Sequence, residues 1–110
     1  MVSPSVNVII PAYNAEATIL RAIASVLKID MEGLRVIVID DCSTDGTFEI
    51  CKNIDDKRLI FLSNDFNHGV AYSRNKGLMF EAEYVAFLDA DDFWYAEKLY
   101  QQLKILNDSS

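Results

Sequence analysis

The hydrophobic residues of this chain gather in four short, nearly continuous runs. The runs are rich in β-branched residues and are bounded by polar turn residues, which is the pattern of β-strands. Because polar positions do not alternate within them, they predict strands that are covered on both faces, as in a parallel sheet. The runs are VNVIIPA at 6–12, LRVIVID at 34–40, RLIFLS at 58–63 and YVAFLDA at 84–90.

Helical spacing of apolar residues separates these runs. It covers residues 15–28, 47–54 and 69–82, and a leucine repeat predicts a last helix after the fourth run. The apolar face of the first helix holds Ile19, Ile23, Val26 and Leu27, and the last repeat holds Leu99, Leu103 and Leu106. Strands that alternate with helices predict an α/β protein, a Rossmann-like three-layer α/β/α fold with a mainly parallel sheet of about four strands.

Length, charge and cysteine content narrow the classes of function. The 110 residues, 51% hydrophobic and 25% charged, indicate one globular domain. A net charge of −7 disfavours nucleic acid as a partner, and it disfavours a phosphorylated ligand unless a divalent cation lies between phosphates and protein carboxylates. Cys42 and Cys51 lack metal-site or disulfide spacing, which predicts free thiols. The apolar runs are too short to cross a bilayer and no signal peptide is evident, so we expect a cytoplasmic protein.

Polar side chains follow each predicted strand. In open parallel sheets, ligands bind at the carboxyl ends of the strands, so the residues that follow the strands are informative. We expect four such loops to meet at one edge of the sheet. They are PAYN at 11–14, DDCSTDGT at 40–47, SNDFNHG at 63–69 and DADD at 89–92.

The acids after the fourth run point to a cation. Asp89 and Asp91 alternate as the chain leaves the strand, so both carboxylates can reach one hard divalent ion, which prefers oxygen ligands. Two protein carboxylates suffice for an ion that keeps several waters and binds substrate phosphates. Asp92 is the acid expected to start the next helix. The alternative is that all three are helix-end and surface acids.

The first two loops carry candidates for binding a planar ligand. Tyr13 is either a stacking platform for a base or a half-buried loop aromatic. Asn14 precedes the first helical pattern and is predicted to be its N-cap. Asp40 and Asp41 stand side by side, and one of them is placed to accept a hydrogen bond from a base imino group or a ribose hydroxyl.

Other polar residues leave two interpretations open. The Ser, Thr and Asp at 43–45 are expected to cap the helix that follows them, so capping does not explain the preceding acid pair. His68 is either a candidate base or a solvated loop histidine. Arg74 either binds an acid of the crevice or a phosphate, or it forms an ordinary surface salt bridge.

Four segments, in this order, resemble the N-terminal half of family 2 glycosyltransferases, inverting enzymes with the GT-A fold. The segments are VNVIIPAYNAEATILRAIASVL, VIVIDDCSTDGT, NHGVAYSRNKGL and YVAFLDADDFWYAEKL. Four ordered motifs at compatible spacings are far more specific than a lone DxD. The resemblance implies a nucleotide-diphosphate-sugar donor, commonly a UDP-sugar, that is bound with Mn²⁺ or Mg²⁺.

The resemblance also implies roles for individual positions. Tyr13 would lie against the base, Asp41 would read it, and Asp40 would lie beside Asp41. In the DxD motif, Asp91 is implied as the better metal ligand and Asp89 as a ribose or metal contact. The nucleotide-sugar site implied in this way comprises Pro11, Tyr13, Asn14, Asp40, Asp41, Arg74, Asp89 and Asp91, with Asp89 and Asp91 holding the metal.

The chain departs from the family pattern mildly at two positions and more seriously in length. Ser73 and Ala96 stand where many relatives have alanine and proline. Family members carry a second half that binds the acceptor and supplies the catalytic base. We therefore expect residues 1–110 to be the donor-binding part of a GT-A domain, truncated before the acceptor-binding half and inactive alone. By family habit, the acceptor is a glycan or a lipid-linked glycan, and the parent protein works at the cytoplasmic face of the membrane. An open sheet edge predicts self-association of the fragment.

Three rival classes share some of these features. A receiver-like signalling domain needs an acid pair after its first strand, which here ends in PAYN, and would use Asp65 as its phosphoacceptor. A phosphatase-like domain would carry its DxD near the start of its sheet, whereas here the motif follows the last predicted strand. A non-catalytic α/β scaffold would keep the fold and bind no ligand.

Overall fold

The computed structural model describes residues 5–95 and contains one four-stranded sheet there. The strands lie in the order β3-β2-β1-β4, and every neighbouring pair is parallel. The strands are β1 (Val6–Ala12), β2 (Leu34–Asp40), β3 (Leu59–Ser63) and β4 (Tyr84–Phe87). The helices are α1 (Ile19–Leu27), α2 (Thr47–Lys52) and α3 (Val70–Gly77).

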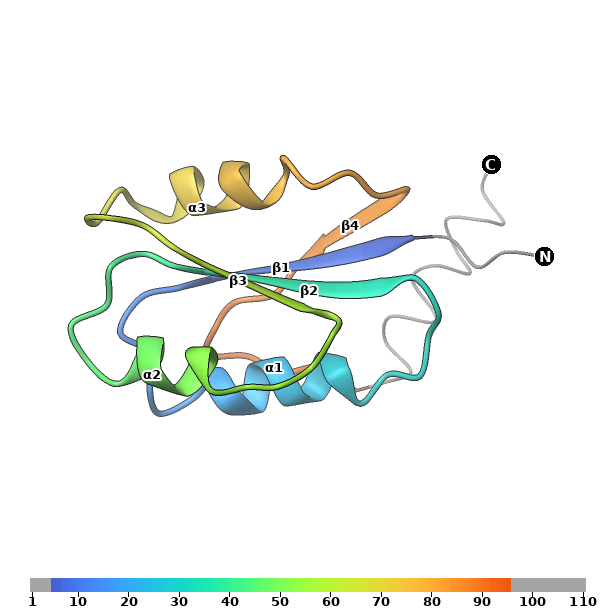
Figure 1. Ribbon diagram of the computed structural model, residues 1–110, viewed down its shortest axis with the longest axis horizontal. Coiled ribbons are helices and arrows are strands. Elements are labelled where there is room, and N and C mark those ends of the chain that lie inside the picture. Colours follow the sequence, from blue (N-terminus) through green and yellow to red (C-terminus); the bar gives the residue numbers. More distant parts are fainter. Residues whose placement is uncertain (1–4, 96–110) are drawn as a thin grey trace.

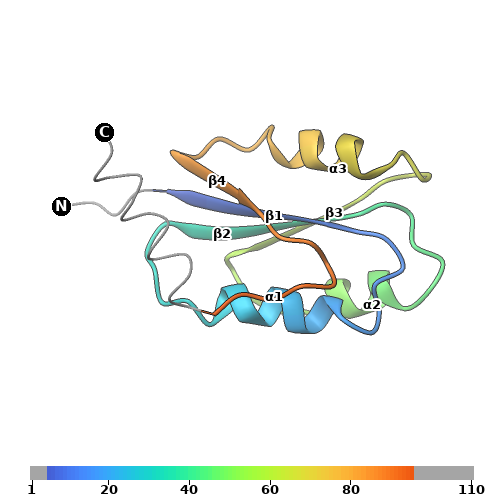
Figure 2. The ribbon, with the colours of Figure 1, turned by 180° about the vertical axis from the view of Figure 1, so that it is seen from behind.

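Helices cover both faces of the sheet. α1 and α2 lie on one face and α3 lies on the other, as Figure 1 and the reverse view in Figure 2 show. Each helix connects two parallel strands, as a parallel sheet requires. The predicted three-layer α/β/α fold with a parallel sheet is therefore confirmed.

The core is built on the two central strands. Successive side chains of a strand point to opposite faces, and both faces of β1 and β2 are covered, which explains their unbroken apolar sequences. On the α3 side, Ile9 and Ile37 are fully buried. α3 packs so closely there that a Cβ on Gly77 would lie 2.7 Å from Cγ2 of Ile9, so glycine is needed at this contact.

The outer elements differ from their predicted bounds. β3 and β4 are edge strands of the described sheet and are only partly buried, in contrast to the prediction that they are covered on both faces. β3 begins after Arg58, whose guanidinium donates to the carbonyl oxygens of Leu27 and Ile29 at the end of α1. β4 ends at Phe87 rather than at residue 90. The predicted helix with the leucine repeat lies outside the described residues.

α3 ends at Gly77, although the sequence pattern continued to residue 82. Residues 78–83 instead form a connection to β4, and side chains of β1 and β2 hydrogen-bond to its carbonyl groups. The buried Asn7 amide donates to the carbonyl of Phe80 at 3.1 Å, and Arg35 donates to the carbonyl of Glu81 at 2.9 Å. These side-chain bonds satisfy carbonyls that another helical turn would have used.

The arrangement brings the loops after the strands to one edge. The loops that follow β1, β2 and β3 leave the sheet at the left of Figure 1, and we call this side the carboxyl edge. Within residues 5–95, no helix is long and apolar enough to cross a membrane.

Candidate functional site at the carboxyl edge

The loop after β1 is fastened to the loop after β2. The Oδ1 atom of Asn14 accepts a hydrogen bond from the N–H of Thr44 at 2.8 Å, and the N–H of Asn14 donates to Oγ of Ser43 at 2.9 Å. Asn14 has a φ of 49° in this tie. The prediction that Asn14 caps the first helix is therefore wrong: α1 begins at Ile19 with Thr18 at its N-cap, and the asparagine joins two loops instead.

A second tie connects the same loops. The N–H of Gly46 donates to Oε2 of Glu16 at 2.9 Å, and a Cβ at Gly46 would lie only 2.7 Å from that oxygen. Among the predicted caps at 43–45, Asp45 accepts the N–H of Thr47, the first residue of α2, at 2.9 Å. Its serine and threonine neighbours bond to other partners. The two loops thus form one rigid platform.

Asp40 has a structural role in this platform. Its side chain is buried and accepts hydrogen bonds from the N–H of Ser43 at 3.4 Å and from the Ser43 hydroxyl. It closes the turn after β2 and does not line the hollow described below. One acid of the adjacent pair therefore closes a turn, which leaves the other for a ligand.

Asp41 is the focus of the site. It is 4% exposed, and its Oδ1 accepts hydrogen bonds from the amide of Asn64 at 2.8 Å and from the N–H of His68 at 2.9 Å. Its Oδ2 accepts from the N–H of Gly69 at 2.8 Å. Burial alone would raise the pKa of Asp41, but these donors together lower it below 3.8. A carboxylate can accept about four hydrogen bonds. Asp41 accepts three, so one acceptor position of this charged group is unused.

The sequence did not single out Asn64, which helps to hold Asp41 in place. Asn64 is buried, and its Oδ1 accepts from Nζ of Lys76 at 3.0 Å. Its amide nitrogen donates to Asp41 and, at 3.1 Å, to Oγ of Ser73. The only sequence signal for Asn64 was its place in a polar loop after a strand, which many asparagines share.

His68 is not a solvated loop histidine. Its ring stacks on Tyr72, with centroids 3.9 Å apart and planes 14° apart, and it lies 3.8 Å from the ring of Phe66. Its Nε2 lies 3.1 Å from Oδ1 of Asp65, and this hydrogen bond lowers the pKa of Asp65. The stack holds the loop whose backbone N–H groups bind Asp41, which is a structural role.

A small hollow of about 70 Å³ opens between the end of β1 and the start of α3. Tyr13 is 49% exposed beside it, so one part of its ring is free to stack on a ligand. The structure thus brings Pro11, Tyr13 and Asp41 together, as the sequence predicted, while Asn14 and Asp40 support the loops behind them. The residues that line the hollow are Pro11, Ala12, Tyr13, Asp41, Val70 and Ser73.

A second cluster lies where the chain leaves β4. The side chain of Asp89 is 68% exposed, and its Oδ1 lies 3.7 Å from a terminal nitrogen of Arg74. The guanidinium of Arg74 also lies over the ring of Phe87, 5.6 Å from its centroid. Its Nε is buried and has no hydrogen-bond partner within residues 5–95. Arg74 thus pairs with a crevice acid and keeps a donor unused.

The other two acids of the DADD loop are exposed. Asp91 lies on the surface, and Asp92 accepts the N–H of Phe93 at 2.8 Å through its Oδ1. The turn is closed by the N–H of Asp92, which donates to the carbonyl of Asp89 at 3.0 Å. The helix that Asp92 was expected to start lies outside the described residues.

The described residues do not form a closed metal cage. No group of three or more His, Cys, Asp or Glu side chains between residues 5 and 95 is arranged to hold a metal ion. Asp89 and Asp91 nevertheless offer hard, solvent-facing oxygen ligands in one short turn. That donor set fits an ion such as Mg²⁺, which binds one or two carboxylates and completes its shell with waters and phosphate oxygens.

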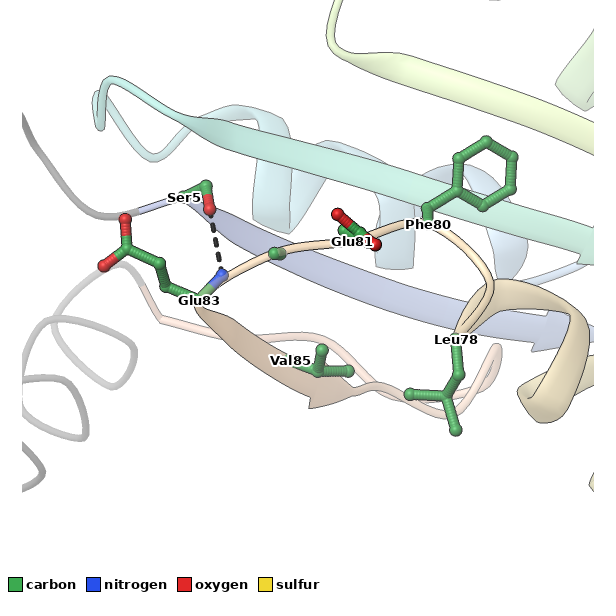
Figure 3. A pocket seen from close by; sticks show the side chains of 7 residues that line it. Ser5, Leu78, Phe80, Glu81, Glu83 and Val85 are labelled. Atoms are coloured by element: carbon green, nitrogen blue, oxygen red, sulfur yellow. Dashed lines mark hydrogen bonds between the residues drawn. The ribbon is translucent and has the colours of Figure 1, made fainter.

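A larger hollow lies at the opposite end of the strands. It measures about 650 Å³ and is drawn in Figure 3, where Oγ of Ser5 accepts the N–H of Glu83 at 2.9 Å. Ser5 precedes β1 and Glu83 precedes β4, so we call this side the amino edge. Its side chains are those of Ser5, Leu78, Phe80, Glu81, Ala82, Glu83 and Val85.

Comparisons with known proteins identify the family of the chain. Residues 7–110 match the family model for glycosyl transferase family 2. The UDP-Glc:alpha-D-GlcNAc-diphosphoundecaprenol beta-1,3-glucosyltransferase WfaP of Escherichia coli is 37% identical over 102 residues, which are 92% of this chain and 41% of that protein. The chain therefore spans about two fifths of the length of such curated relatives.

Solved structures of glycosyltransferases share the fold. S. aureus TarS 1-349 in complex with UDP-GlcNAc has a TM-score of 0.85 at 33% identity, with 94% of this chain and 31% of that chain covered. The mannosyltransferase PcManGT from Pyrobaculum calidifontis, in complex with GDP-Man and Mn²⁺, has a TM-score of 0.79 at 28% identity, with 94% and 34% covered. The similarity to TarS confirms the GT-A type of α/β fold.

Proposed function

The chain belongs to glycosyl transferase family 2, and from this premise we propose that its carboxyl edge binds the nucleotide of a nucleotide-diphosphate-sugar donor, a UDP-sugar in the first instance. The observation that carries the proposal is the hollow in which the exposed ring of Tyr13 meets the buried carboxylate of Asp41. A flat apolar surface beside an acceptor of N–H groups suits a nucleobase. The structures of TarS with UDP and with UDP-GlcNAc support the choice of nucleotide.

The base would be held by stacking and by one hydrogen bond. Stacking on an aromatic ring contributes roughly 1–3 kcal/mol per base, and Tyr13 has the exposure to provide it. The acceptor position left on Asp41 would receive an imino N–H of the base. Asn14 and Asp40 would act indirectly, because they fix the loops that carry these two residues.

Binding the diphosphate requires positive charge, and the protein itself has a net charge of −7. Asp89 and Asp91 would hold Mn²⁺ or Mg²⁺ here, and the Mn²⁺ in the PcManGT complex supports that assignment. Such an ion, when bound, neutralises charge on the departing diphosphate. Arg74 would orient Asp89 and offer a terminal N–H of its partly exposed guanidinium to a phosphate oxygen.

Transfer with inversion also needs a general base for the acceptor hydroxyl. Each acid described at the carboxyl edge has another role: Asp40 and Asp41 bind the loops, and Asp89 and Asp91 face the proposed cation. Asp65 binds the His68 ring, and Asp92 accepts the N–H of Phe93. We propose that the base and the acceptor site lie in the part of the relatives' length that this chain does not cover, so that this chain alone transfers no sugar. The acceptor named for WfaP, a sugar diphosphate on undecaprenol, supports a lipid-linked acceptor and therefore a site of action at a membrane surface.

Calorimetry with UDP tests the donor site. UDP is titrated into the native chain with and without Mn²⁺, and we expect Mn²⁺ to tighten binding at least tenfold. Asp91→Asn should remove most of this gain, whereas Asp92→Asn, which changes the charge equally in the same turn, should keep it. The scaffold alternative predicts no binding of UDP with or without Mn²⁺. Equal UDP affinities with and without Mn²⁺ would contradict the cation site but leave the base site standing.

A further inference from the structure

Ser73 of α3 places a hydroxyl group against the proposed base site. The residue is fully buried from solvent and lines the same hollow as Tyr13 and Asp41. A serine hydroxyl can donate one hydrogen bond and accept two. Within residues 5–95, the Ser73 hydroxyl accepts one hydrogen bond, from Asn64, and donates none. Its proton therefore has no acceptor among the described residues.

The neighbouring network fixes the direction of that proton. Nζ of Lys76 only donates, and it binds Oδ1 of Asn64 at 3.0 Å. Ionised Asp41 only accepts, and its Oδ1 accepts a hydrogen bond from the Asn64 amide nitrogen at 2.8 Å. These two partners set the orientation of the Asn64 amide, so its nitrogen faces Oγ of Ser73 at 3.1 Å as a donor. Ser73 cannot donate to Asn64 in this arrangement.

An acceptor and a donor therefore lie side by side. The same amide nitrogen contacts Oδ1 of Asp41 and Oγ of Ser73, which keeps these two side chains adjacent at the hollow. A planar ligand that enters beside Tyr13 meets the free acceptor position of Asp41 next to the hydroxyl proton of Ser73. The complementary edge has an N–H group next to a carbonyl oxygen.

We propose that Ser73 is a second base-reading residue, whose hydroxyl donates to a carbonyl oxygen of the nucleobase adjacent to the N–H group that Asp41 accepts. Uracil presents such a pair at N3 with O4 or O2, and guanine presents one at N1 with O6. The inference rests on the proposed nucleotide site and adds to it a determinant of specificity on α3.

Thio analogues of the base test this contact at a single atom. Two sets of nucleotides are titrated into the native chain and into Ser73→Ala in the presence of Mn²⁺. The first set is UDP, 4-thio-UDP and 2-thio-UDP, and the second is GDP and 6-thio-GDP. Sulfur is a weak acceptor, so the native chain should bind one thio analogue about 3- to 10-fold more weakly than its parent nucleotide. Ser73→Ala should bind the parent nucleotide more weakly than the native chain does, by a similar factor. This variant should bind the parent nucleotide and the thio analogue equally well.

Two variants control for folding. Ser25→Ala removes another buried serine, whose Oγ accepts the N–H of Trp94 at 3.0 Å away from the hollow, and it should leave all nucleotide affinities unchanged. Ser73→Cys keeps the packing with a much weaker donor and gives the same readout if the alanine variant is unstable.

The outcomes separate this inference from the proposed function. Nucleotide binding in which native chain and Ser73 variants discriminate equally against the thio analogues, or not at all, would overturn the role of Ser73 alone. Failure of the native chain to bind either UDP or GDP would overturn the nucleotide site together with it.

Discussion

The two hollows at opposite ends of the strands differ in size and in chemistry. The hollow of the amino edge is the larger, about 650 Å³ against about 70 Å³, but it presents two like charges, Glu81 and Glu83 (Figure 3). The hollow of the carboxyl edge is small, yet three N–H donors converge there on one buried carboxylate, Asp41. We therefore base the proposed site on convergent polar groups rather than on volume.

The topology explains this difference. At the carboxyl edge, the loops after β1, β2 and β3 meet (Figure 1), and two backbone N–H groups of the loop after β3, those of His68 and Gly69, donate to Asp41. At the amino edge, side chains at the sheet already form hydrogen bonds with backbone groups of the connection between α3 and β4. Asn7 and Arg35 bind the carbonyls of Phe80 and Glu81, and Ser5 binds the N–H of Glu83. Groups that hold a connection in place are not free for a ligand.

The largest effect is expected for Asp41→Asn. The amide cannot accept from all three donors, and one of its own N–H groups would face a buried donor, so we expect a loss of roughly 3 kcal/mol in the free energy of unfolding. UDP affinity should fall at least 100-fold. Urea unfolding and calorimetry measure the two effects. Glu83→Gln makes the same chemical change at the amino edge and should change neither the stability nor the UDP affinity by much. Equal losses of stability and UDP affinity in both variants would refute the distinction between the edges.

Tyr13→Ala should weaken UDP binding by about 5- to 150-fold, since it removes a stacking contribution of roughly 1–3 kcal/mol. The ring is half exposed, so the midpoint of thermal unfolding should hardly change. Tyr13→Phe keeps the ring and should retain UDP affinity. A phenylalanine variant as weak as the alanine variant would show that the hydroxyl, not stacking, matters.

The lowered pKa of Asp41 predicts a dependence of stability on pH. The folded-state pKa lies below the ordinary value of 3.8, so the charged group stabilises the fold above that value. This contribution is lost as the pH falls from about 3.8 through the folded-state pKa. Urea midpoints measured between pH 5 and pH 2 should decline more steeply for the native chain than for Asp41→Asn. Parallel declines would show that Asp41 does not titrate as described.

The smallest effect is expected at the amino edge. Ser5→Ala removes the hydrogen bond to the N–H of Glu83, which is partly exposed to water, and should cost less than about 1 kcal/mol. UDP affinity should be unchanged. A drop in UDP affinity without a drop in stability would place a nucleotide contact in the larger hollow.

The sequence predicted the centre of the fold better than its margins. The bounds of β1 and β2 are confirmed because both strands are buried on both faces, and burial is what an apolar run records. β4 lies at the edge of the described sheet, and its last hydrogen bond to β1 runs from the N–H of Leu88 to the carbonyl of Ile9, whereas the predicted run continues to Ala90. Apolar residues can therefore extend beyond the hydrogen-bonded strand.

For the candidate site, sequence position indicated which residues gather but not what each one does. The placement of Tyr13 and Asp41 after neighbouring parallel strands was enough to bring them together. The tie from Asn14 to Thr44 joins residues 30 positions apart, and the orientation of Asn64 depends on Lys76 of α3. Such roles follow from side-chain partners that no local pattern encodes.

The most direct test of the account is an amide chemical-shift titration of the ¹⁵N-labelled chain with UDP and Mg²⁺, because it reports on both edges in one experiment. We expect the largest changes in amide chemical shift at Tyr13, His68 and Gly69, and almost none at Glu81 and Glu83. Largest shifts at the amino edge, or none at either edge at millimolar UDP, would contradict the account.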